Sequence, residues 1–169
     1  MNTTSSVLVG SQGQTVWVKV RGRGTFQNSP GVKDFVRKMI QRGNRDFVVD
    51  LGECELMDST FMGTLAGVAL RLREIGQGSL RTINVNPRNS SLLENLGLDH
   101  LFSVENDSEV ATPTSLREAD RPPGSDVQKE AVLSAHEALV EADSHNAVKF
   151  KDVIDYLRQE LGEDTHEEG

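Results

Sequence analysis

A serine between an aspartate and a threonine, Asp58-Ser59-Thr60, stands where a short apolar stretch gives way to a helix-forming one. A side chain at a helix start lies beside unpaired backbone N–H groups and the positive end of the helix dipole. Asp58 or Ser59 could therefore act there simply as an N-cap. The same position also suits a phosphoryl group on Ser59, because a helix N-terminus accommodates an anion of about −1.5 to −2 charges. The residue types alone leave both interpretations open.

Other reactive side chains lack the spacing of a catalytic or cofactor site. Cys54 has no histidine near it in the sequence, which favours a partly buried, unreactive thiol. None of the histidines shows metal-ligand spacing such as H-E-x-x-H, and we expect those of the C-terminal part to be solvated. The four histidines are His100, His136, His145 and His166. Gly22-x-Gly24 lacks the third glycine of a dinucleotide loop and is expected to form a turn. The sequence thus predicts a protein that is not an enzyme, with no catalytic residue, no metal and no cofactor.

The net charge of −8 is distributed unevenly along the 169 residues. Residues 1–104 hold 12 basic and 9 acidic residues, whereas residues 105–169 hold 6 and 17. The acidic C-terminal part argues against nucleic-acid binding, because contacts with phosphates need Lys and Arg. A single cysteine excludes an intrachain disulfide, and neither a secretory signal nor an apolar run long enough to span a membrane is recognisable. We expect a cytoplasmic protein with no nucleic-acid partner and no membrane span.

The elements that must position Ser59 follow an α/β pattern. Residues 6–9 and 15–20 are predicted to form a hairpin, and Val16, Val18 and Val20 alternate with Trp17 and Lys19 as in a half-buried strand. A helix is expected from Ser29-Pro30 onward, with Ser29 as its cap. Further strands are expected at residues 46–51, 80–85 and 101–104, and further helices at residues 59–75 and 86–96. The order ββαβαβαβ indicates a mixed sheet with parallel crossovers.

The composition changes after the last of these strands. We expect a domain over residues 1–110, a linker over residues 111–125, a helical acidic extension over residues 126–162 and a disordered tail over residues 163–169. Within the extension, one helix carries a weak Ala-rich stripe, and the next carries apolar residues at helical spacing from Phe150 to Leu161. An apolar face of this kind is seldom left in water. We therefore expect the extension to dock on the domain, on another protein or on a second copy of the chain, rather than only to aid solubility.

Several motifs between Gly22 and Val104 resemble the STAS domain, the family of the anti-sigma-factor antagonists. The matching segments are Val48-Val49-Asp50-Leu51, Met57-Asp58-Ser59-Thr60, the Gly76 turn, Asn84-Val85-Asn86-Pro87, and Leu93-Glu94-Asn95-Leu96-Gly97-Leu98-Asp99-His100-Leu101-Phe102. The resemblance covers about half of the chain. It implies a four- or five-stranded sheet flanked by helices.

The resemblance also implies a function for the serine motif. It places Ser59 as the residue that a partner serine kinase phosphorylates and a serine phosphatase restores. The partner-binding residues would then be Asp58, Ser59, Thr60, Phe61, Met62 and Gly63. The expected partner is an anti-sigma factor or a related serine kinase, and the chain would be a non-enzymatic regulator in a partner-switching pathway.

One residue departs from the family pattern. Phe61 stands where the family usually has glycine after the Asp-Ser-Ser/Thr motif. Its ring either packs in the core or reshapes the partner surface. The second outcome would favour an alternative function, a constitutive STAS adaptor in a signalling or transport complex that is never phosphorylated.

Overall fold

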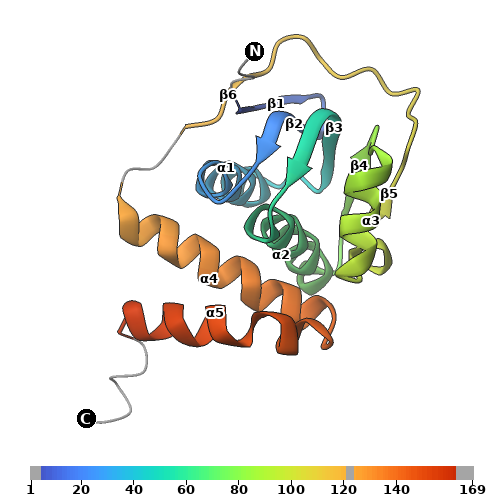
Figure 1. Cartoon of the computed structure of the whole chain (residues 1–169). Helices are drawn as coiled ribbons and strands as arrows, with labels where there is room; N and C mark the ends of the chain where they lie inside the picture. The colour runs from blue at the N-terminus through green and yellow to red at the C-terminus, as the bar shows by residue number, and fades with distance from the viewer. Residues whose placement is uncertain (1–4, 121–123, 163–169) are drawn as a thin grey trace.

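The computed structural model describes residues 5–120 and 124–162 (Figure 1). Its strands are β1 (Ser6–Gln12), β2 (Thr15–Gly24), β3 (Asp46–Met57), β4 (Ser79–Ile83), β5 (Ser103–Val104) and β6 (Arg117–Glu118). Its helices are α1 (Ser29–Gln41), α2 (Ser59–Ile75), α3 (Pro87–Asn95), α4 (Ser125–Ala142) and α5 (Asn146–Glu160), with a 3-10 turn at Leu98–His100. The predicted α/β class is confirmed. Pro122, Pro123 and residues 163–169, which belong to the expected linker and disordered tail, lie outside the described residues.

The strands form a mixed sheet in the order β5-β4-β3-β2-β1-β6. The β1–β2 and β1–β6 pairs are antiparallel, and the β2–β3, β3–β4 and β4–β5 pairs are parallel. The prediction of four or five strands was therefore short by at least one. The additional strand β6 arises within the expected linker, where Arg117 and Glu118 pair with Val9 and Leu8 at the sheet edge.

The centre of the sheet is longer than the sequence predicted. Gly22-x-Gly24 was expected to form a turn, but β2 continues through it and pairs with the second half of β3 up to Met57. Two register shifts interrupt this pairing. Such β-bulges accommodate an extra residue on one of two paired strands. The extension matters for the site because it carries β3 up to the residue before Asp58.

The two faces of the sheet differ in how they are covered. Val16, Val18 and Val20 are at most 1% exposed and pack in the core beneath α1 and α2, as the alternation predicted. On the other face Trp17 forms a small cluster with Val48, Ile83 and Leu116, which comes from the segment after β5. Successive strand residues point to opposite faces, so this division follows directly from the period of two.

A buried carboxylate holds that covering segment on the sheet. Asp50 at the centre of β3 accepts hydrogen bonds from the Gly52 N–H, the Asn84 amide and the Thr112 hydroxyl. Burial raises the pKa of the Asp50 carboxyl, but the three hydrogen bonds outweigh it and leave the pKa below its ordinary value. The ionised carboxylate therefore links β3 to a segment more than sixty residues further along the chain.

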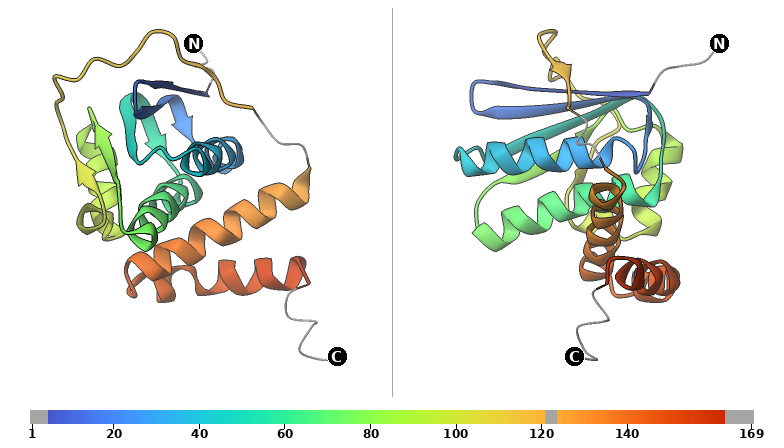
Figure 2. Two further views of the ribbon diagram at one scale, coloured as in Figure 1. Left: turned by 180° about the vertical axis from the view of Figure 1, so that it is seen from behind. Right: turned by 90° about the vertical axis from the view of Figure 1, so that its left-hand side faces the viewer.

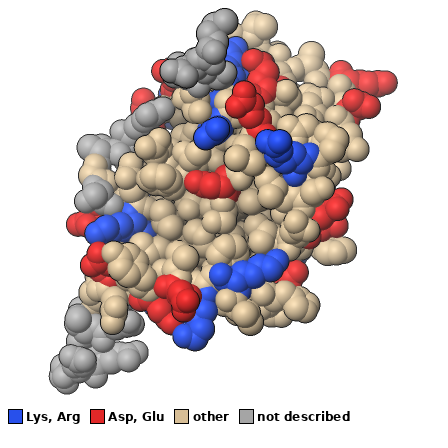
Figure 3. All heavy atoms as spheres, in the orientation of Figure 1, with Lys and Arg blue, Asp and Glu red and all other residues tan. Residues whose placement is uncertain are grey.

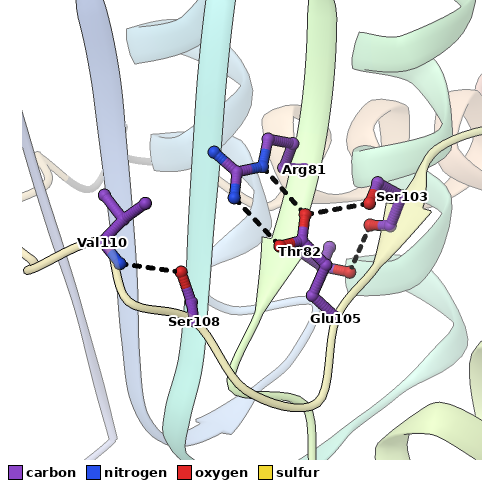
Figure 4. A network of polar contacts seen from close by, with 6 residues as sticks. All are labelled: Arg81, Thr82, Ser103, Glu105, Ser108 and Val110. Atoms are coloured by element: carbon purple, nitrogen blue, oxygen red, sulfur yellow. Dashed lines mark hydrogen bonds and ion pairs between the residues drawn. The ribbon is translucent and has the colours of Figure 1, made fainter.

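An ion pair closes the β4–β5 edge (Figure 4). Arg81 makes two hydrogen bonds to the Glu105 carboxylate, at 2.8 and 2.9 Å, and the Ser103 hydroxyl donates to the same carboxylate. The Thr82 hydroxyl donates to the Ser103 carbonyl beside it. The two-residue strand β5 is thus held against β4 by side-chain hydrogen bonds as well as by its short backbone pairing.

The start of α1 differs slightly from the prediction. Asn28, not Ser29, is the N-cap residue, while Pro30 stands in the first turn as expected. The Ser29 hydroxyl donates to the Thr25 carbonyl instead, because the turn at residues 25–28 brings that carbonyl within reach. The helix itself keeps its place against β1 and β2.

Helices α4 and α5 form a hairpin on the outer side of α2, away from the sheet (Figures 1 and 2). Leu139 of α4 is fully buried in the main core. The buried Asn146 amide at the start of α5 donates to the carbonyls of Leu96 and Leu139. The α4–α5 hairpin therefore makes a third layer, with α1 and α2 between it and the sheet. Among the described residues, no helix has both the length and the apolar character needed to cross a bilayer.

Candidate functional site

The N-terminus of α2 is fixed by Asp58. Its Oδ1 accepts from the Phe61 N–H at 2.8 Å, and its Oδ2 accepts from the Phe26 N–H at 2.9 Å. Its own N–H donates to the Gly24 carbonyl at the end of β2. Asp58 is therefore the N-cap residue, and it ties the helix start to the loop after β2.

Ser59 is the first residue of α2, and its hydroxyl is not used for capping. The Ser59 Oγ lies 2.9 Å from Nε2 of His136 in α4. The other ring nitrogen, Nδ1, lies 2.7 Å from the Val132 carbonyl. A carbonyl can only accept, so Nδ1 carries a proton, and the tautomer with its single proton on Nδ1 accepts from the Ser59 hydroxyl at Nε2.

The environment of His136 contradicts the expectation that this histidine is solvated. Its side chain is only 3% exposed, and its ring meets Phe150 of α5 edge-on, with centroids 4.8 Å apart. The expectation was wrong because acidic sequence neighbours say nothing about a face that folds against another helix. By contrast, the side chain of His145 is 89% exposed.

The remaining residues of the predicted partner surface are largely buried. Phe61 is fully buried, and a Cβ added at Gly24 would lie 2.7 Å from its ring, so the two residues are complementary. Of the two outcomes considered for Phe61, the structure shows that its ring packs in the core. Thr60 and Met62 are each 4% exposed. Gly63 faces Ala135 of α4 with no room for a side chain.

Two features near the site were not found from the sequence. His136 is separated from Ser59 by 77 residues, and no local pattern connects them. Phe26 donates its N–H to Asp58, and its side chain is 42% exposed beside the helix start. An exposed phenylalanine is the type of residue that protein interfaces favour. It was missed because the turn that places it pairs with α2 only in the folded chain.

The other candidates for chemistry are inert. Cys54 lies inside β3, where it is 2% exposed and its Sγ lies 3.5 Å from the Leu56 carbonyl. Burial raises the pKa of the Cys54 thiol, which disfavours the reactive thiolate. No cluster of three or more His, Cys, Asp or Glu side chains suited to a metal ion occurs in the described part of the chain.

Acidic and basic residues are interspersed on the face seen in Figure 3, with no continuous basic patch. Elsewhere on the molecule, acidic and basic side chains of one helix pair locally, as Asp34 does with Arg37 and Lys38 on α1. This face therefore offers no extended electrostatic footprint for nucleic acid.

Comparison with known proteins agrees with this geometry. Residues 7–104 match a family model described as "Mlab, STAS domain". The anti-sigma-B factor antagonist of Staphylococcus aureus is 32% identical over 93 residues, which cover 55% of this chain and 85% of that protein.

Solved structures share the fold at lower identity. The anti-sigma factor antagonist SpoIIAA in its unphosphorylated form has a TM-score of 0.52 and 14% identity, over 61% of this chain and 89% of that one. An anti-sigma factor antagonist from Mycobacterium paratuberculosis has a TM-score of 0.51 and 19% identity, over 60% and 86%. All these matches fall short of the whole chain. Because the family model spans more than half of the sequence, this chain belongs to the STAS domain family.

Proposed function

We propose that this chain is a non-enzymatic anti-sigma-factor antagonist whose binding to an anti-sigma factor or related serine kinase is switched by phosphorylation of Ser59. The observation that carries the proposal is the hydroxyl of Ser59, which stands at the first position of α2 while Asp58 performs the capping. The relative in Staphylococcus aureus is named for antagonism of an anti-sigma factor, and SpoIIAA has been solved in an unphosphorylated form. The first name supports an antagonist function, and the second supports control of that function by phosphorylation.

Phosphorylation would act through charge at a helix end that already holds one carboxylate. The terminal phosphoryl group of a nucleoside triphosphate held by the kinase passes to Ser59 Oγ, the hydroxyl proton leaves, and the nucleoside diphosphate is released. Asp58 already satisfies the N–H groups of Phe61 and Phe26. The added dianion must therefore be accommodated by water or by the partner. At an interface its desolvation and its repulsion from acidic groups readily supply the few kcal/mol that lower affinity 100-fold.

The constitutive adaptor remains the second candidate, and one observation favours it. The Ser59 hydroxyl is bonded to His136 and lies beneath α4 in this structure. A site that is always covered would never be phosphorylated. The two functions differ in whether the covered state is permanent.

Phosphosite mapping of the native protein separates the two functions. The chain is captured from its own host with bound proteins, and its phosphopeptides are mapped. A switch antagonist carries phosphate on Ser59 and co-purifies with a serine kinase or anti-sigma factor in its unphosphorylated form. Thr60, which is 4% exposed, serves as an internal control that should stay unmodified. Capture of a stable complex with Ser59 unmodified under every growth condition would support the adaptor instead.

A further inference from the structure

We infer that the α4–α5 hairpin is an intramolecular cover that occupies the partner surface around Ser59, so that kinase or partner gains access only when the hairpin lifts. This inference rests on the proposed function for the identity of the partner. The cover itself rests on contacts within the chain, which can be measured separately.

The first contact is the hydrogen bond between Ser59 and His136. A phosphoryl group on Ser59 Oγ would lie beside the imidazole ring, because Oγ and Nε2 are only 2.9 Å apart. Phosphorylation also removes the hydroxyl proton that this bond uses. The bond and the phosphoryl group are therefore mutually exclusive in this arrangement.

The second contact is a close approach of helix backbones. A Cβ added at Gly63 would overlap the Ala135 carbonyl, and one added at Gly67 would lie 3.8 Å from the Ala138 Cβ. Helix α4 therefore lies directly on the first turns of α2. These turns include Thr60, Met62 and Gly63, which the family resemblance assigns to partner binding. A partner and α4 cannot contact Gly63 at the same time.

Charge complementarity supports the docking. The Lys33 amine of α1 donates to the Ser134 hydroxyl of α4, and Glu130 and Glu137 lie close enough to attract it. The acidic extension thus meets a basic side chain of the domain beside the covered surface. Lys149 adds a bond to the Asn95 carbonyl at the end of α3.

The hairpin has the internal contacts to move as one body. Leu133 of α4 packs with Ile154 and Leu157 of α5 in a cluster separate from the main core. Glu137 pairs with Arg158, and Lys129 pairs with Glu160, both between the two helices. The hairpin joins the sheet edge through residues 119–124, because the segment before them is held on the sheet by Thr112, Leu116 and strand β6.

A disulfide between the two helices tests the cover in the full chain. The 3.8 Å separation at Gly67 and Ala138 matches the Cβ separation of natural disulfides. The locked variant is Gly67→Cys with Ala138→Cys in a Cys54→Ala background, and its matched control carries Ser at both positions. Binding and phosphorylation are measured with the partner captured from the host. We expect the oxidised variant to bind and be phosphorylated at least 10-fold less than the control, with recovery on reduction. Equal behaviour of locked and control chains would overturn the inference.

A second readout needs no partner. Ser59→Cys is added to the locked chain and to its Ser control, and the rate of alkylation at position 59 is followed by mass spectrometry. The cover predicts at least 10-fold slower alkylation when locked, and equal rates would overturn it. Slow alkylation together with unchanged partner binding would also overturn the inference, because the partner surface would then lie elsewhere. Slow alkylation with no kinase or anti-sigma factor captured would contradict the proposed function and leave the cover standing.

Single substitutions guard against a failure of the locked variant to fold. His136→Ala removes the bond to Ser59 and the ring contact with Phe150, and His145→Ala changes an exposed histidine of the same hairpin. Loss of the hydrogen bond alone is expected to raise the fraction of uncovered chain roughly 2- to 10-fold. Partner affinity of the chain with Ser59 intact should rise by at least that factor for His136→Ala and stay unchanged for His145→Ala. No increase for His136→Ala would count against the cover.

Discussion

The Ser59 Oγ lies 2.9 Å from Nε2 of His136, which joins the first residue of α2 to a residue of α4 that follows 77 positions later in the chain. The domain that presents Ser59 and the extension that covers it are therefore one packed unit in this structure. The inferred cover therefore has α4 competing with any protein that contacts Ser59.

Close packing at Gly63 makes a sharp prediction. Gly63→Ala would push a methyl group into the Ala135 carbonyl, whereas Gly67→Ala would meet the Ala138 methyl at an ordinary 3.8 Å. We expect Gly63→Ala to destabilise the fold by about 1–3 kcal/mol or to displace the hairpin. Gly67→Ala should be neutral or slightly stabilising, because alanine favours helix. Urea unfolding and limited proteolysis of α4 measure both effects, and equal stability of the two variants would contradict the packing described.

The capping role of Asp58 can be tested by stability alone. Asp58→Ala removes the acceptors of the Phe61 and Phe26 N–H groups, so we expect a loss of about 1–2 kcal/mol in the free energy of unfolding. Asp107→Ala changes an exposed aspartate in the loop after β5 and should shift stability by less than about 0.5 kcal/mol. Chemical denaturation of both variants gives the comparison. A loss as small for Asp58 as for Asp107 would show that the cap is not formed.

The Arg81–Glu105 pair is expected to make a contribution to folding stability that is lost in acid (Figure 4). Hydrogen bonding from Arg81 lowers the pKa of Glu105 from 4.5 to about 2. A lowered carboxyl pKa means that the pair stabilises the fold above about pH 4.5 and that this contribution is lost as the pH falls through about 2. About a third of each side chain is exposed, so solvent screening limits the contribution to about 1 kcal/mol.

The Glu105→Gln variant measures directly how much this ion pair contributes to the free energy of unfolding. The variant should be less stable than the parent at pH 6, and the difference should shrink toward zero near pH 2 and diminish in high salt. Thermal unfolding over that pH range provides the measurement. A difference that grows as the pH falls would have the wrong sign for a carboxylate stabilised in its ionised form.

Local sequence patterns correctly predicted elements whose ends and faces are set by neighbouring residues. The helix expected over residues 59–75 is found with those bounds, because Asp58 caps it and Gly76, at a φ of 81°, ends it in the left-handed conformation. The strand at Val16, Val18 and Val20 was equally visible, since burial on one face imposes a period of two.

What the sequence did not reveal depends on contacts between distant segments. The second half of β3 was expected to be a loop because it carries charged residues such as Glu53, yet the half-exposed Glu53 side chain pairs with Lys19 of β2 at 2.6 Å. Strand β6 has only two residues and exists through its pairing with β1. The role of His136 follows from the docking of α4 on α2, which no spacing within α4 specifies.

Binding of the captured partner to Ser59→Asp and Ser59→Ala chains tests the central claim most directly. Both substitutions remove the serine hydroxyl that bonds His136, and only Ser59→Asp places a negative charge at the start of α2. Isothermal titration with the purified partner should show Ser59→Ala binding at least as tightly as the parent chain and Ser59→Asp binding at least 10-fold more weakly. Equal affinity of the two variants would contradict a phosphorylation switch at Ser59.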